Sequence, residues 1–66
     1  MQLMINGESR EIPGADSVEA LLKHLELDPR AVVVELNRVI IRRPAIASTT
    51  LAENDTVEIV HFVGGG

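Results

Sequence analysis

The sequence predicts one α+β domain, in which a mixed sheet of four to five strands is covered on one face by a single helix. Three observations predict this class. Aliphatic and β-branched residues fall into short strand-like runs, only one segment repeats its apolar residues at helical spacing, and the strands are segregated from that segment along the chain. With 66 residues, the chain lies near the lower limit for a domain that folds without help.

The chain begins with a predicted β-hairpin. Met1–Asn6 alternates apolar and polar residues, with Leu3 and Ile5 on one side. Asn6-Gly7 follows, and this dipeptide favours a type I′ turn because both central positions need positive φ. The return strand is expected over Ser9–Ile12, where a Pro-Gly pair ends it.

One helix is predicted after the hairpin. Asp16 and Ser17 offer capping oxygens, and Glu19 stands three residues after Asp16, as a capping box requires. The apolar residues then recur at helical spacing at Val18, Leu21, Leu22 and Leu25. The helix is expected to end near Leu27, because Pro29 disfavours helical geometry at the residue before it. It is too short to be stable alone, so it must pack on the sheet.

Two strands joined by a tight turn are predicted next. Ala31–Leu36 is rich in β-branched residues, and Val39–Ile41 follows after Asn37-Arg38. Alternation along the first of these strands predicts that Val32, Val34 and Leu36 point inward. Val33 and Glu35 are expected to point outward.

The last part of the chain contains a crossing segment and a final strand. Ala45–Thr50 has no clear period and is expected to wrap over an edge of the sheet with one helical turn. Leu51 is expected to fill the core. After a turn at residues 53–55, Thr56–Val63 is the predicted last strand, with its inward side chains at Val57 and Ile59.

Composition argues against several function classes. The chain has no Cys, so it has no disulfide, no nucleophilic thiol and no thiolate metal site. A net charge of −4, scattered cations and a single aromatic residue argue against nucleic acid as a partner. His24 and His61 lie far apart, which predicts surface residues and no metal site. Short apolar runs and the lack of a signal peptide predict a soluble cytoplasmic protein with no membrane partner.

Three glycines follow the last predicted strand. Gly64, Gly65 and Gly66 have no Cβ, so we expect a domain over residues 1–63 and a slim, flexible tail over residues 64–66. Such a tail can be threaded through a narrow channel, with a free carboxylate at its end. The alternative for the tail alone is a frayed or artificial terminus.

The whole chain resembles the β-grasp fold of ubiquitin and the sulfur-carrier proteins. The similarity is closest to the sulfur carriers of thiamin biosynthesis, and it depends on the chain length and on four segments: Val34-Glu35-Leu36-Asn37, Arg43-Pro44, Leu51 through Asp55, and Glu58 through Gly66. A diglycine end alone is less specific, since ubiquitin-like modifiers and the small subunit of molybdopterin synthase share it. This sequence departs from that pattern by having three terminal glycines.

The resemblance implies a carrier that is a co-substrate and not an enzyme. An E1-like adenylyltransferase would use ATP to activate the Gly66 carboxylate, and a persulfide supplied by a cysteine desulfurase system would convert it to a thiocarboxylate. Thiazole synthase would then accept the sulfur. Gly64 and Gly65 would thread the tail into these partners, and no cofactor would be bound by the chain itself.

The resemblance also implies a docking face. By analogy with ubiquitin-like proteins, the side chains pointing away from the helix would meet the activating enzyme and thiazole synthase: Val33, Glu35, Glu58, Val60 and Phe62, with Ile40 nearby. The alternative is that some of them cover a second small core beneath Ala45–Thr50.

Two functional alternatives remain open from the sequence. One is a sulfur carrier for another pathway, such as those of molybdopterin or cysteine. The other is a ubiquitin-like modifier or interaction domain, whose tail forms isopeptide bonds or has no role. In all three cases the carboxylates at residues 16–19 and 53–55 are explained by a cap and a turn, without catalysis.

Overall fold

A computed structural model of the protein describes residues 1–62. Within this range the chain forms five strands, one α-helix and two short 3-10 turns, which confirms the predicted α+β class. In chain order these elements are β1 (Gln2–Ile5), β2 (Glu8–Glu11), α1 (Val18–His24), η1 (Pro29–Ala31), β3 (Val32–Leu36), β4 (Val39–Ile41), η2 (Arg43–Ala45) and β5 (Thr56–His61).

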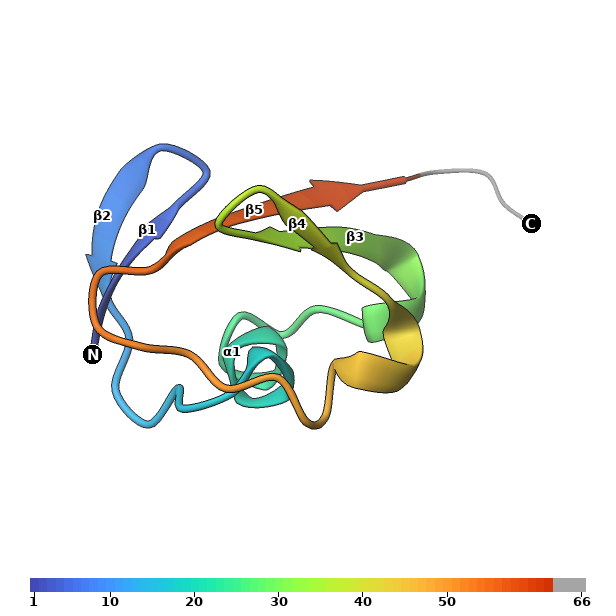
Figure 1. The fold of residues 1–66 in the computed structure, drawn as a ribbon, viewed down its shortest axis with the longest axis horizontal. Helices are drawn as coiled ribbons and strands as arrows, with labels where there is room; N and C mark the ends of the chain where they lie inside the picture. Colours follow the sequence, from blue (N-terminus) through green and yellow to red (C-terminus); the bar gives the residue numbers. More distant parts are fainter. Residues whose placement is uncertain (63–66) are drawn as a thin grey trace.

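The five strands form one mixed sheet in the order β2-β1-β5-β3-β4. The last strand therefore lies in the middle: β5 is parallel to β1 on one side and antiparallel to β3 on the other. Figure 1 shows β5 running across the molecule above α1. β5 is hydrogen-bonded on both sides, as are its neighbours β1 and β3, and it is the central strand of the sheet and the one that leads toward the glycines.

Two type I′-like turns fix the register of the hairpins. Asn6 and Gly7 have φ of 49° and 84°, and Asn37 and Arg38 have φ of 50° and 73°. The first turn puts Ile5 opposite Glu8, so β2 begins and ends one residue earlier than the predicted Ser9–Ile12. The residue after β2 turns inward instead: Ile12 is buried, and its N–H donates to the Met1 carbonyl.

Both ends of α1 differ from the prediction. The N-cap is Ser17, whose Oγ accepts from the Ala20 N–H, so the expected Asp16–Glu19 capping box does not form. The helix ends at His24, three residues before Leu27. Glu26 adopts φ of 60°, and the N–H groups of Glu26 and Leu27 donate to carbonyls of the last turn, which is a Schellman motif. The helix therefore ends through a left-handed cap, before Pro29 can exert its effect.

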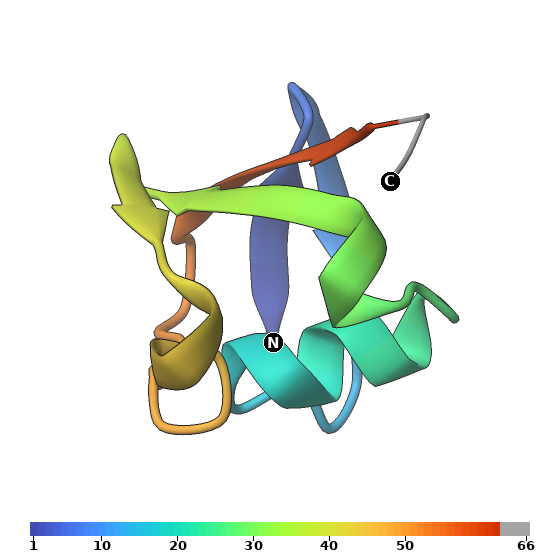
Figure 2. The ribbon, with the colours of Figure 1, turned by 90° about the vertical axis from the view of Figure 1, so that its right-hand side faces the viewer.

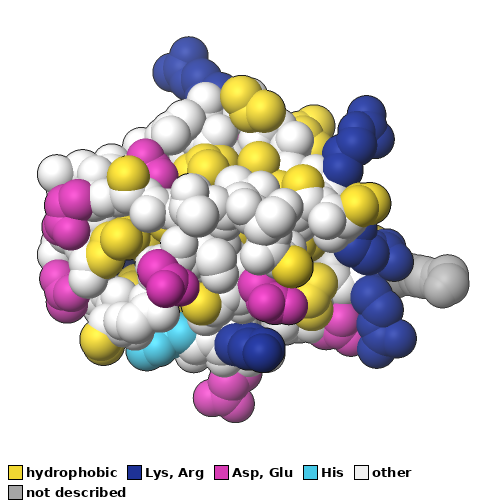
Figure 3. All heavy atoms as spheres, turned by 60° about the horizontal axis from the view of Figure 1, so that its bottom comes forward, with side chains coloured by type: hydrophobic (Ala, Val, Ile, Leu, Met, Phe, Trp, Pro, Cys, Tyr) yellow, Lys and Arg dark blue, Asp and Glu magenta, His cyan; other side chains and the backbone are white. Residues whose placement is uncertain are grey.

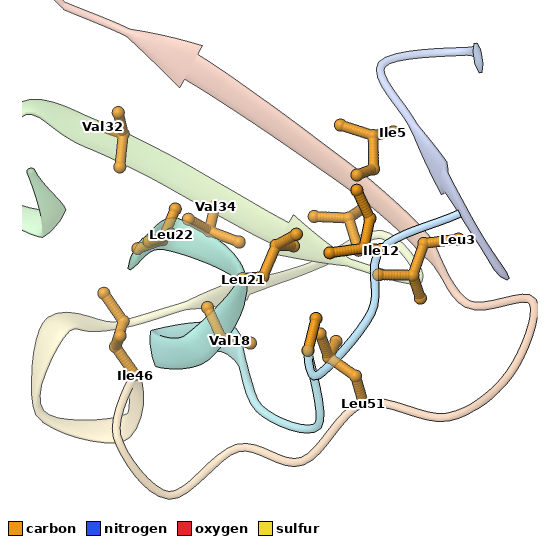
Figure 4. Close-up of a cluster of buried hydrophobic side chains, with 12 residues drawn as sticks. Leu3, Ile5, Ile12, Val18, Leu21, Leu22, Val32, Val34, Ile46 and Leu51 are labelled. Atoms are coloured by element: carbon orange, nitrogen blue, oxygen red, sulfur yellow. The ribbon is translucent and has the colours of Figure 1, made fainter. Parts of the chain in front are cut away.

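The core lies between the sheet and α1, as Figure 4 shows. Its side chains come from the inward positions of β1, β3 and β5 and from the inner face of the helix: Leu3, Ile5, Val18, Leu21, Leu22, Val32, Val34 and Val57. The crossing segment closes the remaining side with Ile46 and Leu51, both buried, so the predicted core role of Leu51 is confirmed. Its single helical turn is η2, which begins two residues before the expected Ala45–Thr50 range and ends at Ala45. Figure 2 shows that this segment runs beside α1 under the sheet.

Candidate functional site

The end of β5 is the place from which the glycines extend. Phe62 follows the strand, and its N–H donates to the Ala31 carbonyl at 3.1 Å, so the backbone is held up to the last described residue. Val63 and the predicted functional residues Gly64, Gly65 and Gly66 lie outside the described residues. The structure therefore describes the chain up to Phe62, two residues before the first glycine, and the surfaces around Phe62.

Two asparagine side chains hold β5 in place. The Asn6 amide bonds both backbone groups of Ile59: its Oδ1 accepts from the Ile59 N–H at 2.8 Å and its Nδ2 donates to the carbonyl at 3.2 Å. At the start of the strand, Asn37 Oδ1 accepts from the Thr56 N–H at 3.0 Å. The sequence predicts both residues only as turn formers. The signal for the additional role is asparagine at the first φ-positive position of each turn, where its side chain can reach the neighbouring strand.

The register places the predicted docking residues on the sheet face away from α1. Val33 lies directly opposite Val60, and Glu35 lies opposite both Glu58 and Ile40. We name this surface the outer face and define it by Val33, Glu35, Ile40, Glu58, Val60 and Phe62. The exposed fractions of Val60 and Phe62 are 61% and 49%, whereas inward Val34 is 1% exposed. Val33, Ile40 and Phe62 line an open hollow together with Ile46 of the crossing segment, but all three are exposed and so do not form a second buried core there. Docking itself stays a prediction.

Glu35 and Glu58 bring two carboxylates onto neighbouring positions of this face. Glu35 is half-buried and Glu58 is exposed. Within residues 1–62 the ion pairs are those of the Met1 amino group with Glu11 and of Arg30 with Asp28, so neither Glu35 nor Glu58 has a cation within 4.0 Å in this part of the chain. Like charges directly opposite each other on adjacent strands destabilise a sheet.

A hollow of about 240 Å³ adjoins the end of β5. It is open to solvent, and its lining is mainly apolar with two arginines: Pro29, Val32, Val33, Ile40, Ile41, Arg42, Arg43, Ile46 and Phe62. Arg30 lies beside it in η1 and bonds Asp28 through Nε and Nη2 at 3.2 and 3.0 Å, which holds the pKa of the Asp28 carboxyl below its ordinary value. In Figure 3, several basic side chains lie along the right-hand side, and others lie at the upper left and at the bottom.

The remaining candidate groups are the two histidines and the acidic side chains. His24 and His61 are exposed, as expected for surface histidines. Residues 1–62 contain no group of three or more His, Asp or Glu side chains placed to hold a metal ion. None of the helices in this range has the length and apolar character needed to cross a membrane.

Comparison with known proteins gives a consistent result over the whole chain. The ThiS family model matches residues 3–66. The chain is 40% identical over 50 residues to the sulfur carrier protein ThiS of Bacillus subtilis, with 76% of each protein covered. It is 38% identical to the thiamine biosynthesis protein (ThiS) of Geobacter metallireducens, whose crystal structure superposes with a TM-score of 0.83 and full coverage of both chains.

A second group of similar proteins is longer. The chain is 44% identical over its full length to a thiazole synthase of Paramagnetospirillum magneticum and 36% identical to one of Magnetococcus marinus. It spans 20% of the length of each of these proteins. These matches place a ThiS-like segment within proteins that bear the name of a synthase.

Proposed function

We propose that this chain, which belongs to the ThiS family, carries the sulfur atom that enters the thiazole moiety of thiamin. The observation that carries the proposal is the extent of the family match, which continues through the glycines to Gly66. The similarity to a protein named as a sulfur carrier supports the same role. In this role the chain is a co-substrate acting in the cytoplasm, and it is regenerated after each transfer.

The proposed chemistry takes place at the Gly66 carboxylate. A carboxylate is a poor electrophile at neutral pH, so an E1-like adenylyltransferase first joins it to the α-phosphorus of ATP and releases pyrophosphate. A persulfide, supplied by a cysteine desulfurase system, attacks the acyl carbon and displaces AMP. A thiol then cleaves the sulfur–sulfur bond and leaves the thiocarboxylate. Thiazole synthase accepts this sulfur, and an oxygen atom from water or from the acceptor takes its place on the acyl carbon, which restores the carboxylate.

The body of the protein supports this chemistry by presenting the tail from a rigid strand. β5 is bonded on both sides, its middle is held by Asn6, and Phe62 is held by Ala31. Three extended glycines reach roughly 10 Å beyond Val63. That reach is enough to cross an active-site channel while the folded body stays outside.

We place the docking surface for both partners on the outer face. The side chains proposed to make contact are Val33, Glu35, Glu58, Val60 and Phe62. They lie on β5, on the paired strand β3 and at Phe62 just after β5, so a protein bound there lies close to the end of β5 that leads to the tail. An exposed apolar cluster of this kind on a small domain commonly marks a protein interface.

Intact-mass measurement tests the proposal. The protein is incubated with ATP, the E1-like enzyme and a persulfide donor from the same organism, with ATP omitted in the control. The expected product has one oxygen replaced by sulfur, and thiazole synthase should convert it back to the carboxylate. Adducts through lysine side chains would identify a modifier instead. A thiocarboxylate that thiazole synthase does not consume would assign the carrier to another pathway.

A further inference from the structure

We propose that the protein that binds the outer face recognises the charged side chains on and beside this face as well as its apolar side chains. Its contact surface is apolar at the centre, carries a basic side chain over Glu35 and Glu58, and carries an acidic group near Arg42 and Arg43. This inference rests on the proposed function, since it describes the surface through which a carrier meets its partner. It adds the chemistry and the orientation of that partner.

The apolar part of the outer face is continuous across two strands. Val33 and Val60 are direct cross-strand neighbours, and Phe62 follows Val60 on the same face of β5. Ile40 extends the cluster onto β4 with 59% of its surface exposed. By contrast β2, at the opposite edge of the sheet, consists only of polar residues. The exposed aliphatic surface is thus concentrated on the half of the sheet that leads to the tail.

Two carboxylates interrupt this apolar surface. Glu35 and Glu58 face each other across β3 and β5, and Glu35 is also flanked by Ile40. Placing like charges opposite each other costs stability in the free protein, and the cores of interfaces are generally depleted of charge. Both costs are offset when a partner inserts one cation, because a guanidinium can bond two carboxylates at once. The apolar surroundings of the pair therefore indicate a partner with an arginine or lysine at this point.

The opposite charge lies beside the outer face, at the hollow that adjoins the end of β5. Arg42 and Arg43 are exposed, line the hollow together with Phe62, and have no acidic group within 4.0 Å among residues 1–62. The positive charge at this place contrasts with the net charge of −4 of the whole chain. β5 runs from the acidic pair toward this hollow, because Glu58 lies within the strand and Phe62 follows its end. A partner with complementary charges can bind in one orientation along β5, which directs the tail to one side of that partner.

Paired charge-neutral variants test the acidic half of the inference. Glu35→Gln with Glu58→Gln removes both carboxylates, and Glu8→Gln with Glu26→Gln is the matched control, since these residues are exposed off the outer face. Binding to the E1-like enzyme and to thiazole synthase is measured by calorimetry. We expect the first variant to bind at least one of them about tenfold more weakly while resisting urea better than the wild type. The control should bind as the wild type does.

A second pair tests the basic half. Arg42→Gln with Arg43→Gln should weaken binding to the same enzyme whose affinity depends on Glu35 and Glu58. The matched control, Arg10→Gln with Lys23→Gln, should leave that affinity unchanged. The Glu35/Glu58 variant and the Arg42/Arg43 variant should each also show less salt dependence of affinity than the wild type.

Two results would overturn the proposed recognition of charge. One is wild-type affinity in the Glu35/Glu58 variant. The other is an equal loss of affinity in the matched control, which would indicate attraction by net charge alone. The proposed function is tested separately, because wild-type protein that binds neither enzyme would overturn both proposals. If the wild type binds and is converted to the thiocarboxylate, and the Glu35/Glu58 variant binds with the same affinity, only the proposed recognition of charge is overturned.

Discussion

The side-chain amide of Asn6 occupies the place of a strand residue opposite Ile59. Backbone pairing between β1 and β5 ends at Ile5 and Val57, and the amide continues it by accepting from the Ile59 N–H and donating to its carbonyl. A residue whose backbone forms a turn thus extends the sheet by its side chain. The contact lies three residues before Phe62, so it stabilises the part of β5 from which the tail is presented.

Replacing Asn6 should weaken this strand. Asn6→Gly keeps the left-handed backbone of φ 49° but removes both side-chain bonds, and we expect a loss of about 1–2 kcal/mol in the free energy of unfolding. Urea unfolding measures the change. Asn54→Gly is the matched control, because Asn54 also has positive φ, at 70°, and its side chain has no recorded bond within residues 1–62. Equal losses in the two variants would contradict the role of the amide.

Phe62→Asp should separate docking from folding. The substitution places a carboxylate on the apolar surface beside Val60, and we expect affinity for the E1-like enzyme to fall about tenfold to a hundredfold. Surface plasmon resonance measures the affinity. Val39→Asp is the control: Val39 is 62% exposed but belongs to the inward register of β4. Unchanged binding of Phe62→Asp would remove Phe62 from the interface.

Gly65→Ala should block conversion while the fold persists. The added methyl group widens the tail and restricts φ, so we expect little thiocarboxylate and an unchanged urea midpoint. Gly7→Ala should do the reverse. Gly7 has φ of 84° in the hairpin turn, so Ala there should cost about 1 kcal/mol of stability and leave conversion intact. Intact mass and urea unfolding are measured on both variants, and normal conversion of Gly65→Ala would argue against a threaded tail.

Asp28→Asn should make stability less dependent on acidic pH. The Arg30 guanidinium holds the pKa of Asp28 below its ordinary value of 3.8, so the pair stabilises the folded state above that value. The contribution disappears as the pH falls through the lower pKa of the folded state. The wild type should therefore be more stable than Asp28→Asn near neutral pH and equally stable near about pH 2.

Thermal unfolding across this range measures the difference. Asp16→Asn, which removes an exposed carboxylate with no recorded side-chain bond within residues 1–62, is the control and should show no such convergence. A constant difference between wild type and Asp28→Asn at all pH values would mean that the ion pair contributes nothing.

The local parts of the fold could be predicted because their signals lie in neighbouring residues. Asn6-Gly7 specifies a turn with positive φ, Val18 to Leu22 repeats at helical spacing, and alternation assigns Val33 and Val34 to opposite faces. The ends of the elements were less predictable. The helix ends at His24, and the left-handed residue of its cap is Glu26 and not a glycine. This cap forms together with the packing of Leu27 on the core, which the local sequence does not indicate.

The sequence by itself determined the α+β class, the outward side of the final strands and the resemblance carried by Gly64 to Gly66. Only the tertiary structure decided that β5 enters between β1 and β3, since strand order depends on how all elements share one core. The same order sets Glu35 against Glu58 and joins Arg42 and Phe62 at one hollow. The local sequence gives no signal of such contacts between residues far apart in the chain, because the strand register is set only when the sheet forms.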